Sequence, residues 1–176
     1  MAFTAADVKN LREMTGVGMM DCKKALTEAD GNVDKAIEIL REKGLAASQK
    51  KAGRIAAEGM AYAAVFDGIG VVVEVNAETD FVGKNEKFVD FVKGVAATVA
   101  KCAPADMDAL MACKYADTDL TVEQQQQEMV LVIGENISIR RFVRYEGDCV
   151  AYVHGGGRIG VLVRFEADDS AAASTA

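Results

Sequence analysis

The sequence predicts an α+β protein: an N-terminal three-helix bundle, a helical linker, and then an antiparallel sheet packed with helices. Over residues 1–44, apolar side chains recur every three to four positions, which is the period of amphipathic helices. From Met60 onward the period becomes two, which is typical of half-buried strands. Hydrophobic residues make up 51% of the chain, enough to build a substantial core.

The expected domain boundaries follow from these changes of period and composition. They are a ubiquitin-associated-like bundle over residues 1–44, a basic helical linker over 45–59, an α+β core lobe over 60–167 and a disordered tail over 168–176. The tail residues are small and polar at a chain end, which favours disorder.

Local signals place the helices of the bundle. Thr4 and Asp7 have the spacing of a capping box at the start of the first helix, whose apolar face includes Met14. A glycine-bearing turn then leads to the second helix. Asn32 is a suitable N-cap for the third helix, and Gly44 is expected to end it. The pattern resembles the ubiquitin-associated type of three-helix module.

The linker is rich in Ala and Lys and poor in large apolar residues. Alanine favours a helix, but such a helix contributes little to a core. A basic binding patch and an ordinary solvated helix face are both compatible with this composition.

The core lobe mixes strands and helices. Asp67-Gly68 is a hairpin signal between two alternating segments. An amphipathic helix with Phe88, Phe91 and Val95 on one stripe then runs to Pro104. We expect further helices over residues 106–114 and 121–133, and strands over 137–146, 150–154 and 158–166.

Asp80 and Phe81 stand side by side where a β-branched run gives way to the amphipathic helix. In one interpretation Thr79 or Asp80 caps the helix and Phe81 packs onto it, and the spacing alone favours this. In the other, Phe81 faces outward as the kind of aromatic anchor that dominates an interface.

Met19 and Met20 open the second helix. Neighbours on a helix point about 100° apart, so both cannot occupy the core face. We expect one to be exposed, near Arg12 or Lys23, where a flexible thioether suits an adaptable protein contact.

Several functional classes are excluded by composition. The net charge is −7, and residues after 54 carry ten Lys and Arg against nineteen Asp and Glu, which argues against direct nucleic-acid binding. No apolar run approaches the roughly 18 residues of a membrane span, and no secretory signal is seen, so we expect a soluble protein. The four cysteines form no CxxC pair, which excludes common zinc sites and indicates free thiols in a reducing compartment.

No catalytic constellation emerges from the motifs. Gly155, Gly157 and Gly160 satisfy GxGxxG, but a strand follows them where a dinucleotide site needs a helix. No GxxxxGK[ST] phosphate loop is present. His154 is the single histidine, and its pattern alone favours a structural role. We therefore expect a protein that is not an enzyme and has no cofactor or metal of its own.

Four segments, in order, resemble the signature blocks of the translation elongation factor Ts family. They are TGVGMMDCKKAL at 15–26, EVNAETDFV at 74–82, IGENI at 133–137 followed by Arg140-Arg141, and HG at 154–155 followed by RIGVL at 158–162. The likeness extends to Phe165, and four blocks in the family's order make it specific. Many family members continue past this point into a second lobe, so a short branch and a missing C-terminal portion are both open.

The resemblance implies a nucleotide-exchange factor that binds elongation factor Tu, in its GDP-bound and nucleotide-free forms, and promotes GDP release during elongation. It implies that Asp80 and Phe81, with Val82 beside them, intrude near the partner's magnesium and GDP site, and that His154 supports this intrusion. The further implied contacts are Arg12, Met19, Met20 and Lys23 on the bundle, and Ile133 and Gly134 in the third block.

Other interpretations remain open at this point. A ubiquitin-associated-type binding adaptor without exchange activity is the alternative function. The sequence leaves homodimer formation open. The resemblance implies the bacterial cytoplasm, and the mature form of an organellar protein is also compatible.

Overall fold

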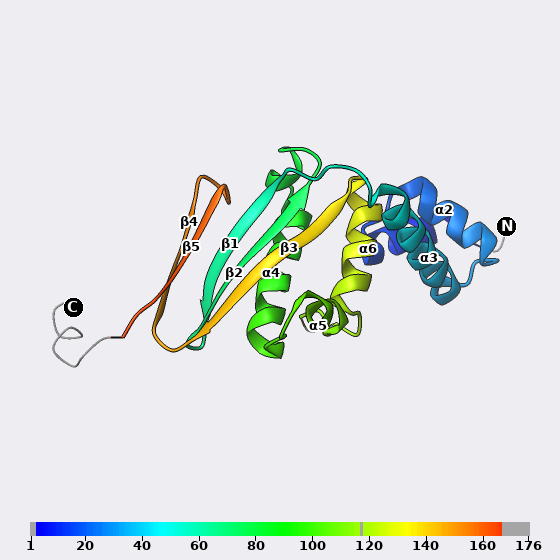
Figure 1. The fold of residues 1–176 in the computed structure, drawn as a ribbon. Helices are drawn as coiled ribbons and strands as arrows, with labels where there is room; N and C mark the ends of the chain where they lie inside the picture. The colour runs from blue at the N-terminus through cyan, green and yellow to red at the C-terminus, as the bar shows by residue number, and fades with distance from the viewer. Residues whose placement is uncertain (1–2, 117, 167–176) are drawn as a thin grey trace. The chain divides into compact units, whose positions relative to one another are not determined.

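The computed structural model describes residues 3–116 and 118–166. The chain divides into two compact units, which are described separately. The bundle unit holds the residues up to Arg54 together with 124–136, and the sheet unit holds 55–123 and the residues from 137 onward. Figure 1 labels the elements of both units.

The bundle unit consists of four helices. They are α1 (Ala5–Thr15), α2 (Met19–Glu28), α3 (Val33–Lys51) and most of α6 (Val122–Ile133). The capping box at Thr4 and Asp7 and the Asn32 cap of α3 are confirmed. The glycine-bearing turn after α1 begins with Gly16 in the left-handed conformation. Leu11, Cys22, Leu26 and Leu40 lie in the core, and Cys22 is a free thiol.

The prediction that Gly44 ends the third helix is wrong. Helix α3 continues to Lys51, and Gly44 lies buried within it. A Cβ at this position would stand 3.1 Å from the backbone oxygen of Gln127, so the glycine permits close packing of α6. A mid-helix glycine costs about 1 kcal/mol of helix propensity relative to alanine. The separate linker helix over 45–59 is likewise wrong, because 45–51 belong to α3.

Helix α6 is a sequence-distant member of the bundle unit. Leu131 and Val132 pack against the core formed by α1, α2 and α3. Arg41 Nε on α3 lies 3.3 Å from Glu128 Oε1 on α6, and Asn136 donates to the Arg54 carbonyl at 2.8 Å. The unit is therefore built from two stretches of chain that residues 55–123 separate in the sequence.

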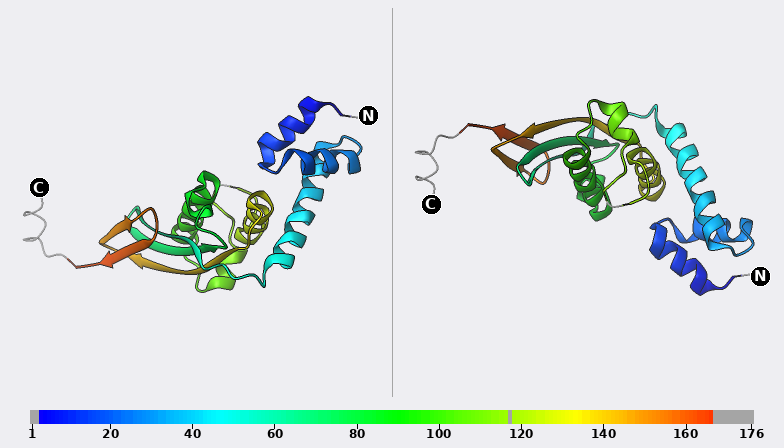
Figure 2. Two further views of the ribbon diagram at one scale, coloured as in Figure 1. Left: turned by 90° about the horizontal axis from the view of Figure 1, so that it is seen from above. Right: turned by 90° about the horizontal axis from the view of Figure 1, so that it is seen from below.

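The sheet unit is organised around a three-stranded antiparallel sheet in the order β1-β2-β3. Its strands are β1 (Glu58–Phe66), β2 (Ile69–Ala77) and β3 (Ile137–Glu146). Val71, Val73 and Val75 alternate as buried residues toward α4 (Glu86–Cys102), which Figures 1 and 2 show along one face of the sheet. The predicted hairpin turn is confirmed, with positive φ at both Asp67 and Gly68.

A second hairpin packs on the sheet, formed by β4 (Cys149–His154) and β5 (Ile159–Arg164). A Cβ at Gly70 would meet Leu162 and Cys149 at 2.7 and 2.8 Å. Gly70 and Val71 are successive strand residues and face opposite sides of the sheet. Because Val71 faces α4, the hairpin that contacts Gly70 covers the opposite side. The strand predicted after the glycine turn is confirmed as β5, so the GxGxxG match does not lead into a helix N-terminus of the kind that holds a pyrophosphate.

The segment around α5 (Met107–Ala112) packs on α4. The Tyr115 ring stacks on Phe91 with 5.8 Å between centroids, and its hydroxyl donates to the Phe91 carbonyl at 3.3 Å. Gly94 leaves the space that the Tyr115 ring occupies. Within the described ranges, no helix has the length and apolar character needed to cross a bilayer.

Candidate functional site

The loop between β2 and α4 carries the Asp80-Phe81 pair. After β2, residues Val82–Lys84 form a 3₁₀ turn, η1, and Asn85 then caps α4 by accepting from the Lys87 amide at 3.0 Å. The prediction that Thr79 or Asp80 caps this helix is wrong. The 3₁₀ turn places the first helical residue of α4 five residues beyond Phe81, so the cap falls at Asn85.

Phe81 and Val82 point to opposite sides of the loop. Phe81 is 81% exposed, whereas Val82 is 5% exposed. The interpretation of Phe81 as a core anchor, which the spacing favoured, is therefore wrong, because its neighbour Val82 fills that role. Val82, expected as a partner contact, has its side chain turned inward and supports the loop from beneath. Asp80 is exposed beside the ring.

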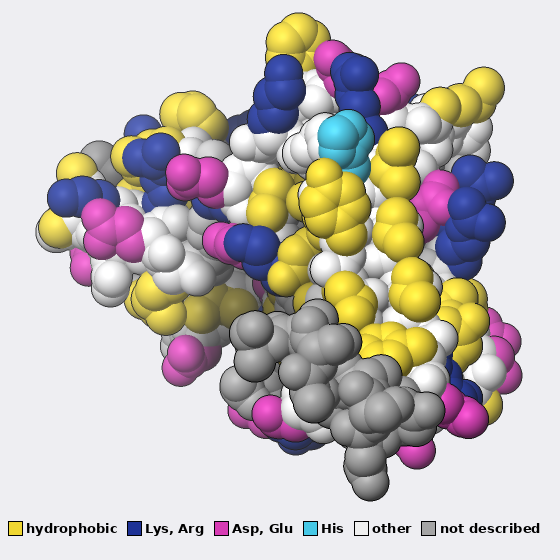
Figure 3. Space-filling view, turned by 90° about the vertical axis from the view of Figure 1, so that its left-hand side faces the viewer, with side chains coloured by type: hydrophobic (Ala, Val, Ile, Leu, Met, Phe, Trp, Pro, Cys, Tyr) yellow, Lys and Arg dark blue, Asp and Glu magenta, His cyan; other side chains and the backbone are white. Residues whose placement is uncertain are grey.

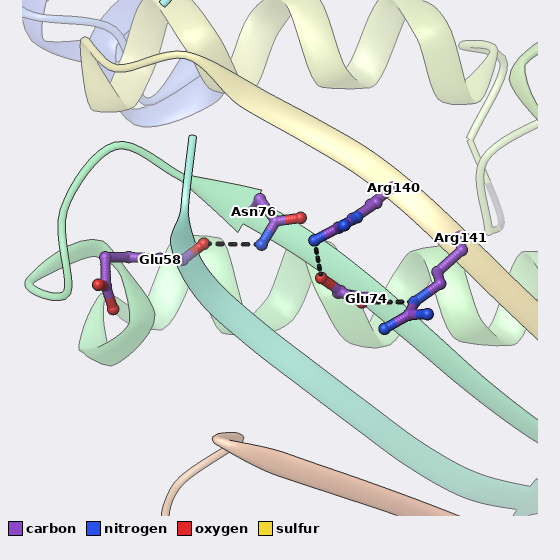
Figure 4. Close-up of polar contacts among 5 residues, drawn as sticks. All are labelled: Glu58, Glu74, Asn76, Arg140 and Arg141. Carbon is purple, nitrogen blue, oxygen red and sulfur yellow. Dashed lines mark hydrogen bonds and ion pairs between the residues drawn. The ribbon is translucent and has the colours of Figure 1, made fainter. Parts of the chain in front are cut away.

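The loop rests on the start of β1. A Cβ at Gly83 would stand 3.1 Å from the Gly59 carbonyl oxygen, so η1 and β1 approach backbone to backbone. Buried Asn76 donates to the Glu58 carbonyl at 3.0 Å and ties the end of β2 to β1, as Figure 4 shows. The exposed Phe81 therefore sits on a loop held from two sides.

His154 lies at the tip of the β4–β5 hairpin. It is exposed, and its Nδ1 lies 3.0 Å from the Tyr152 hydroxyl. Three glycines with positive φ follow it, and the last, Gly157, accepts a hydrogen bond from the Ala61 amide at 2.7 Å. The hairpin tip and the Phe81 loop thus both attach to residues 59–61, although His154 and Phe81 are far apart in sequence.

A charged cluster lies beside this stretch and was not identified as a site from the sequence. Arg140 Nη1 lies 3.1 Å from Glu74 Oε1, and Arg141 Nε lies 2.6 Å from Oε2, as Figure 4 shows. Partial burial raises the pKa of Glu74, but the two guanidinium groups outweigh it and lower the pKa overall. The sequence shows Glu74 and the adjacent pair Arg140-Arg141, but their proximity follows only from the register in which β2 pairs with β3.

The bundle unit carries the remaining candidates. Met19 is 43% and Met20 63% exposed, so the expectation of a single exposed methionine is wrong. Val17, at 4% exposure, fills the core at this end of α2. Met14 is also exposed, at 59%, although its spacing placed it on the core face. Arg12 and Lys23 are exposed on α1 and α2.

Ile133 and Gly134 end α6. Ile133 is half-buried, and Gly134 is exposed with φ of 87° and donates to the Val130 carbonyl at 3.0 Å. The structure therefore places Asp80, Phe81 and His154 in the sheet unit and the other candidates on the bundle unit.

Comparison with known proteins decides the family. The family model described as Elongation factor TS matches residues 78–176, more than half of the chain. The chain belongs to the elongation factor Ts family. The match begins at Glu78 and so takes in the Phe81 loop, the end of α6 and the hairpin tip.

Relatives within the elongation factor Ts family extend the likeness to the bundle. The chain is 53% identical to "Elongation factor Ts" of Syntrophotalea carbinolica over 94% of its length, and 53% identical to that of Trichlorobacter lovleyi over 96%. It is 51% identical to that of Clostridium perfringens over 95% of its length. In each case it covers 56% of the relative, so the chain spans just over half the length of these proteins.

Proposed function

We propose that this chain promotes GDP release from elongation factor Tu during translation elongation. The observation that carries the proposal is Phe81, 81% exposed beside the acidic Asp80 on a firmly held loop. A large aromatic exposed in this way is the kind of side chain that anchors a protein interface. The family relationship supports the same function.

The loop is suited to act as a wedge because it is ordered before any partner binds. Val82 is buried beneath it, Gly83 packs on Gly59, and Asn85 fixes the start of α4. A preorganised loop loses little conformational entropy on binding, so more of the contact energy remains for the partner.

The proposed mechanism is a difference in affinity between two states of the partner. Phe81 enters an apolar space near the partner's magnesium and GDP site, and Asp80 perturbs the field around that cation. Displacing the groups that hold Mg²⁺ and phosphate weakens GDP binding. By linkage, GDP weakens the wedge by the same factor, so the chain binds nucleotide-free partner more tightly than the GDP form. No covalent bond is made or broken, so the chain acts as an exchange factor and not as an enzyme.

The bundle unit is proposed as a second docking surface for the same partner. Exposed Met19 and Met20, flanked by Arg12 and Lys23, combine adaptable apolar contact with positive charge. Ile133 and Gly134 are proposed as further contacts, and His154 as a support for the wedge. We propose that the chain acts in the bacterial cytoplasm, where translation elongation takes place.

We further propose that the outer face of the β4–β5 hairpin pairs with a second copy of the chain. Val150 faces Val163 and Tyr152 faces Val161 across the hairpin, and all four are between 39% and 58% exposed. Figure 3 shows hydrophobic side chains gathered on this side of the molecule. Sedimentation equilibrium should give a dimer for the parent chain and a monomer for Tyr152→Glu; a monomeric parent would contradict it.

The exchange function is tested by stopped-flow release of fluorescent GDP from elongation factor Tu. The parent chain should accelerate release, and Phe81→Ala should lose at least about tenfold of that acceleration, as expected for an interface anchor. Phe165→Ala, at the opposite end of the hairpin from its tip, is the matched control and should behave like the parent. Equal release rates with and without the parent chain would disprove exchange activity.

The adaptor alternative is favoured by one observation, the three exposed methionines on a ubiquitin-associated-like bundle. It predicts capture of ubiquitin-like proteins. Parallel pull-downs with ubiquitin and with nucleotide-free elongation factor Tu separate the two functions, since each predicts retention of only one of these proteins.

A further inference from the structure

A groove opens in the sheet unit between the start of β1 and the tip of the β4–β5 hairpin. Its volume is about 560 Å³. Residues from β1, β2 and β3 and from the hairpin turn line it, among them Glu58, Gly59, Glu74, Arg141, Gly157 and Arg158. The residues named are either charged or glycine, so they present charged groups and exposed backbone to the groove.

The charges around the groove are unequally paired. Glu74 is held by Arg140 and Arg141 at 3.1 and 2.6 Å, so its charge is already neutralised. Arg158 is exposed on the opposite wall, and within residues 3–116 and 118–166 its side chain makes no ion pair. The residues that line the groove include two carboxylates, of Glu58 and Glu74, and two guanidinium groups, of Arg141 and Arg158. Arg141 is already paired with Glu74, so Arg158 is the lining cation that remains available to an incoming anion.

The groove adjoins the proposed wedge. Gly59 lines the groove and is also the residue on which Gly83 of the Phe81 loop packs. Gly157 lines it from the other side and is fixed to Ala61 by a hydrogen bond of 2.7 Å. The Phe81 loop and the groove therefore have Gly59 as a common neighbour.

We propose that the groove receives an acidic side chain of the guanine-nucleotide-binding partner and that Arg158 pairs with its carboxylate. The inference rests on the proposed function, since the partner is the protein that Phe81 contacts. A planar guanidinium matches a carboxylate with two parallel hydrogen bonds. The polar groove accepts a charged side chain, while Phe81 supplies the apolar anchor. Arg158 thus sets affinity and specificity, and Phe81 drives nucleotide release.

The test compares the parent chain with Arg158→Ala, Arg158→Lys and Arg164→Ala. Arg164 is an exposed arginine at the far end of β5 and is the matched control. Binding to nucleotide-free elongation factor Tu is measured by titration calorimetry, and GDP release by stopped flow at increasing chain concentration. Loss of the charged hydrogen bonds in Arg158→Ala should weaken binding about tenfold and leave the saturating release rate unchanged.

Further expectations sharpen the result. Arg158→Lys should lose less affinity than Arg158→Ala, Arg164→Ala should match the parent, and added salt should weaken the parent more steeply than Arg158→Ala. The inference is overturned if Arg158→Ala binds like the parent or if Arg164→Ala loses as much affinity. If the parent binds but does not accelerate GDP release, the exchange function fails, while weaker binding by Arg158→Ala still supports the acidic contact. If the parent does not bind the partner, both fail.

Discussion

Phe81 and Val82 are adjacent apolar residues with opposite environments. The 3₁₀ turn that follows β2 directs Val82 into the sheet unit and Phe81 into solvent. A side chain that contacts solvent contributes little to folding, so Phe81 is available for binding without loss of stability. At the scale of single residues, the stability of this loop and its proposed function therefore involve different side chains.

This separation predicts different effects of two substitutions on folding. Val82→Ala removes buried methyl groups and should lower the free energy of unfolding by about 2 kcal/mol. Phe81→Ala should change it by less than about 0.5 kcal/mol, because the ring is largely exposed. Urea denaturation followed by circular dichroism measures both. A Phe81→Ala chain that unfolds as readily as Val82→Ala would show that the ring is part of the core.

Tyr115 predicts a loss of stability at alkaline pH. Burial, with a smaller effect from the Asp90 carboxylate, raises its pKa from 10.0 to about 12. The fold therefore favours the neutral phenol, and its contribution is complete below pH 10.0 and lost as pH rises toward about 12. Urea midpoints measured from about pH 9 to about pH 11 should fall more steeply for the parent than for Tyr115→Phe. Parallel curves would mean that the phenol does not titrate differently in the folded chain.

Secondary-structure elements are positioned by caps and by close backbone approaches. Asn85 defines where α4 begins, and hence how far the Asp80-Phe81 loop extends beyond the sheet. Gly44 and Gly83 each remove a Cβ that would crowd a neighbouring backbone oxygen at 3.1 Å. Arg144 on β3 donates to the Ala100 carbonyl near the other end of α4. These contacts hold the helix and the loop as one element.

The cap of α4 can be tested directly. Asn85→Ala should cost about 1 kcal/mol of unfolding free energy, because the Lys87 amide loses its acceptor. Asp80→Ala, in the same loop but outside the cap, should leave thermal stability unchanged. Calorimetric melting of the two variants is the measurement, and the reverse order of stabilities would restore Asp80 as the cap.

At the scale of the whole molecule, charge and chain topology distinguish the two units. The bundle unit carries ten Lys and Arg against ten Asp and Glu, while the sheet unit carries ten against seventeen. The net negative charge of the chain therefore belongs to the sheet unit. The bundle unit also includes α6, which follows β1, β2, α4 and α5 in the sequence.

The packing of α6 in the bundle unit predicts that a change in this helix is felt in α1, α2 and α3. Leu131→Ala should remove packing from the bundle core and reduce hydrogen-exchange protection of the α1 to α3 amides by about tenfold. Ile55→Ala, at a side chain that is 85% exposed, is the control and should change nothing. Unchanged protection in Leu131→Ala would show that the three N-terminal helices are stable without α6.

Most of the secondary structure could be predicted because its signals are local. The Thr4-Asp7 box, the Asn32 cap and the Asp67-Gly68 turn act through neighbouring backbone groups, and alternation along β2 reports which face is buried. The α+β class and the family resemblance, carried by short motifs, followed from the same local information.

What only the tertiary structure decided depends on residues distant in sequence. Gly44 has the local signature of a helix end, but it lies within α3 where α6 packs closely against it. The spacing favours Phe81 as a core anchor, but the neighbouring Val82 occupies the core instead. The loop of Phe81 and the hairpin turn that follows His154 both contact the first residues of β1, although the three segments are far apart in sequence. Local patterns determine which helices and strands form, whereas the exposure of a side chain is set by what the rest of the chain places over it.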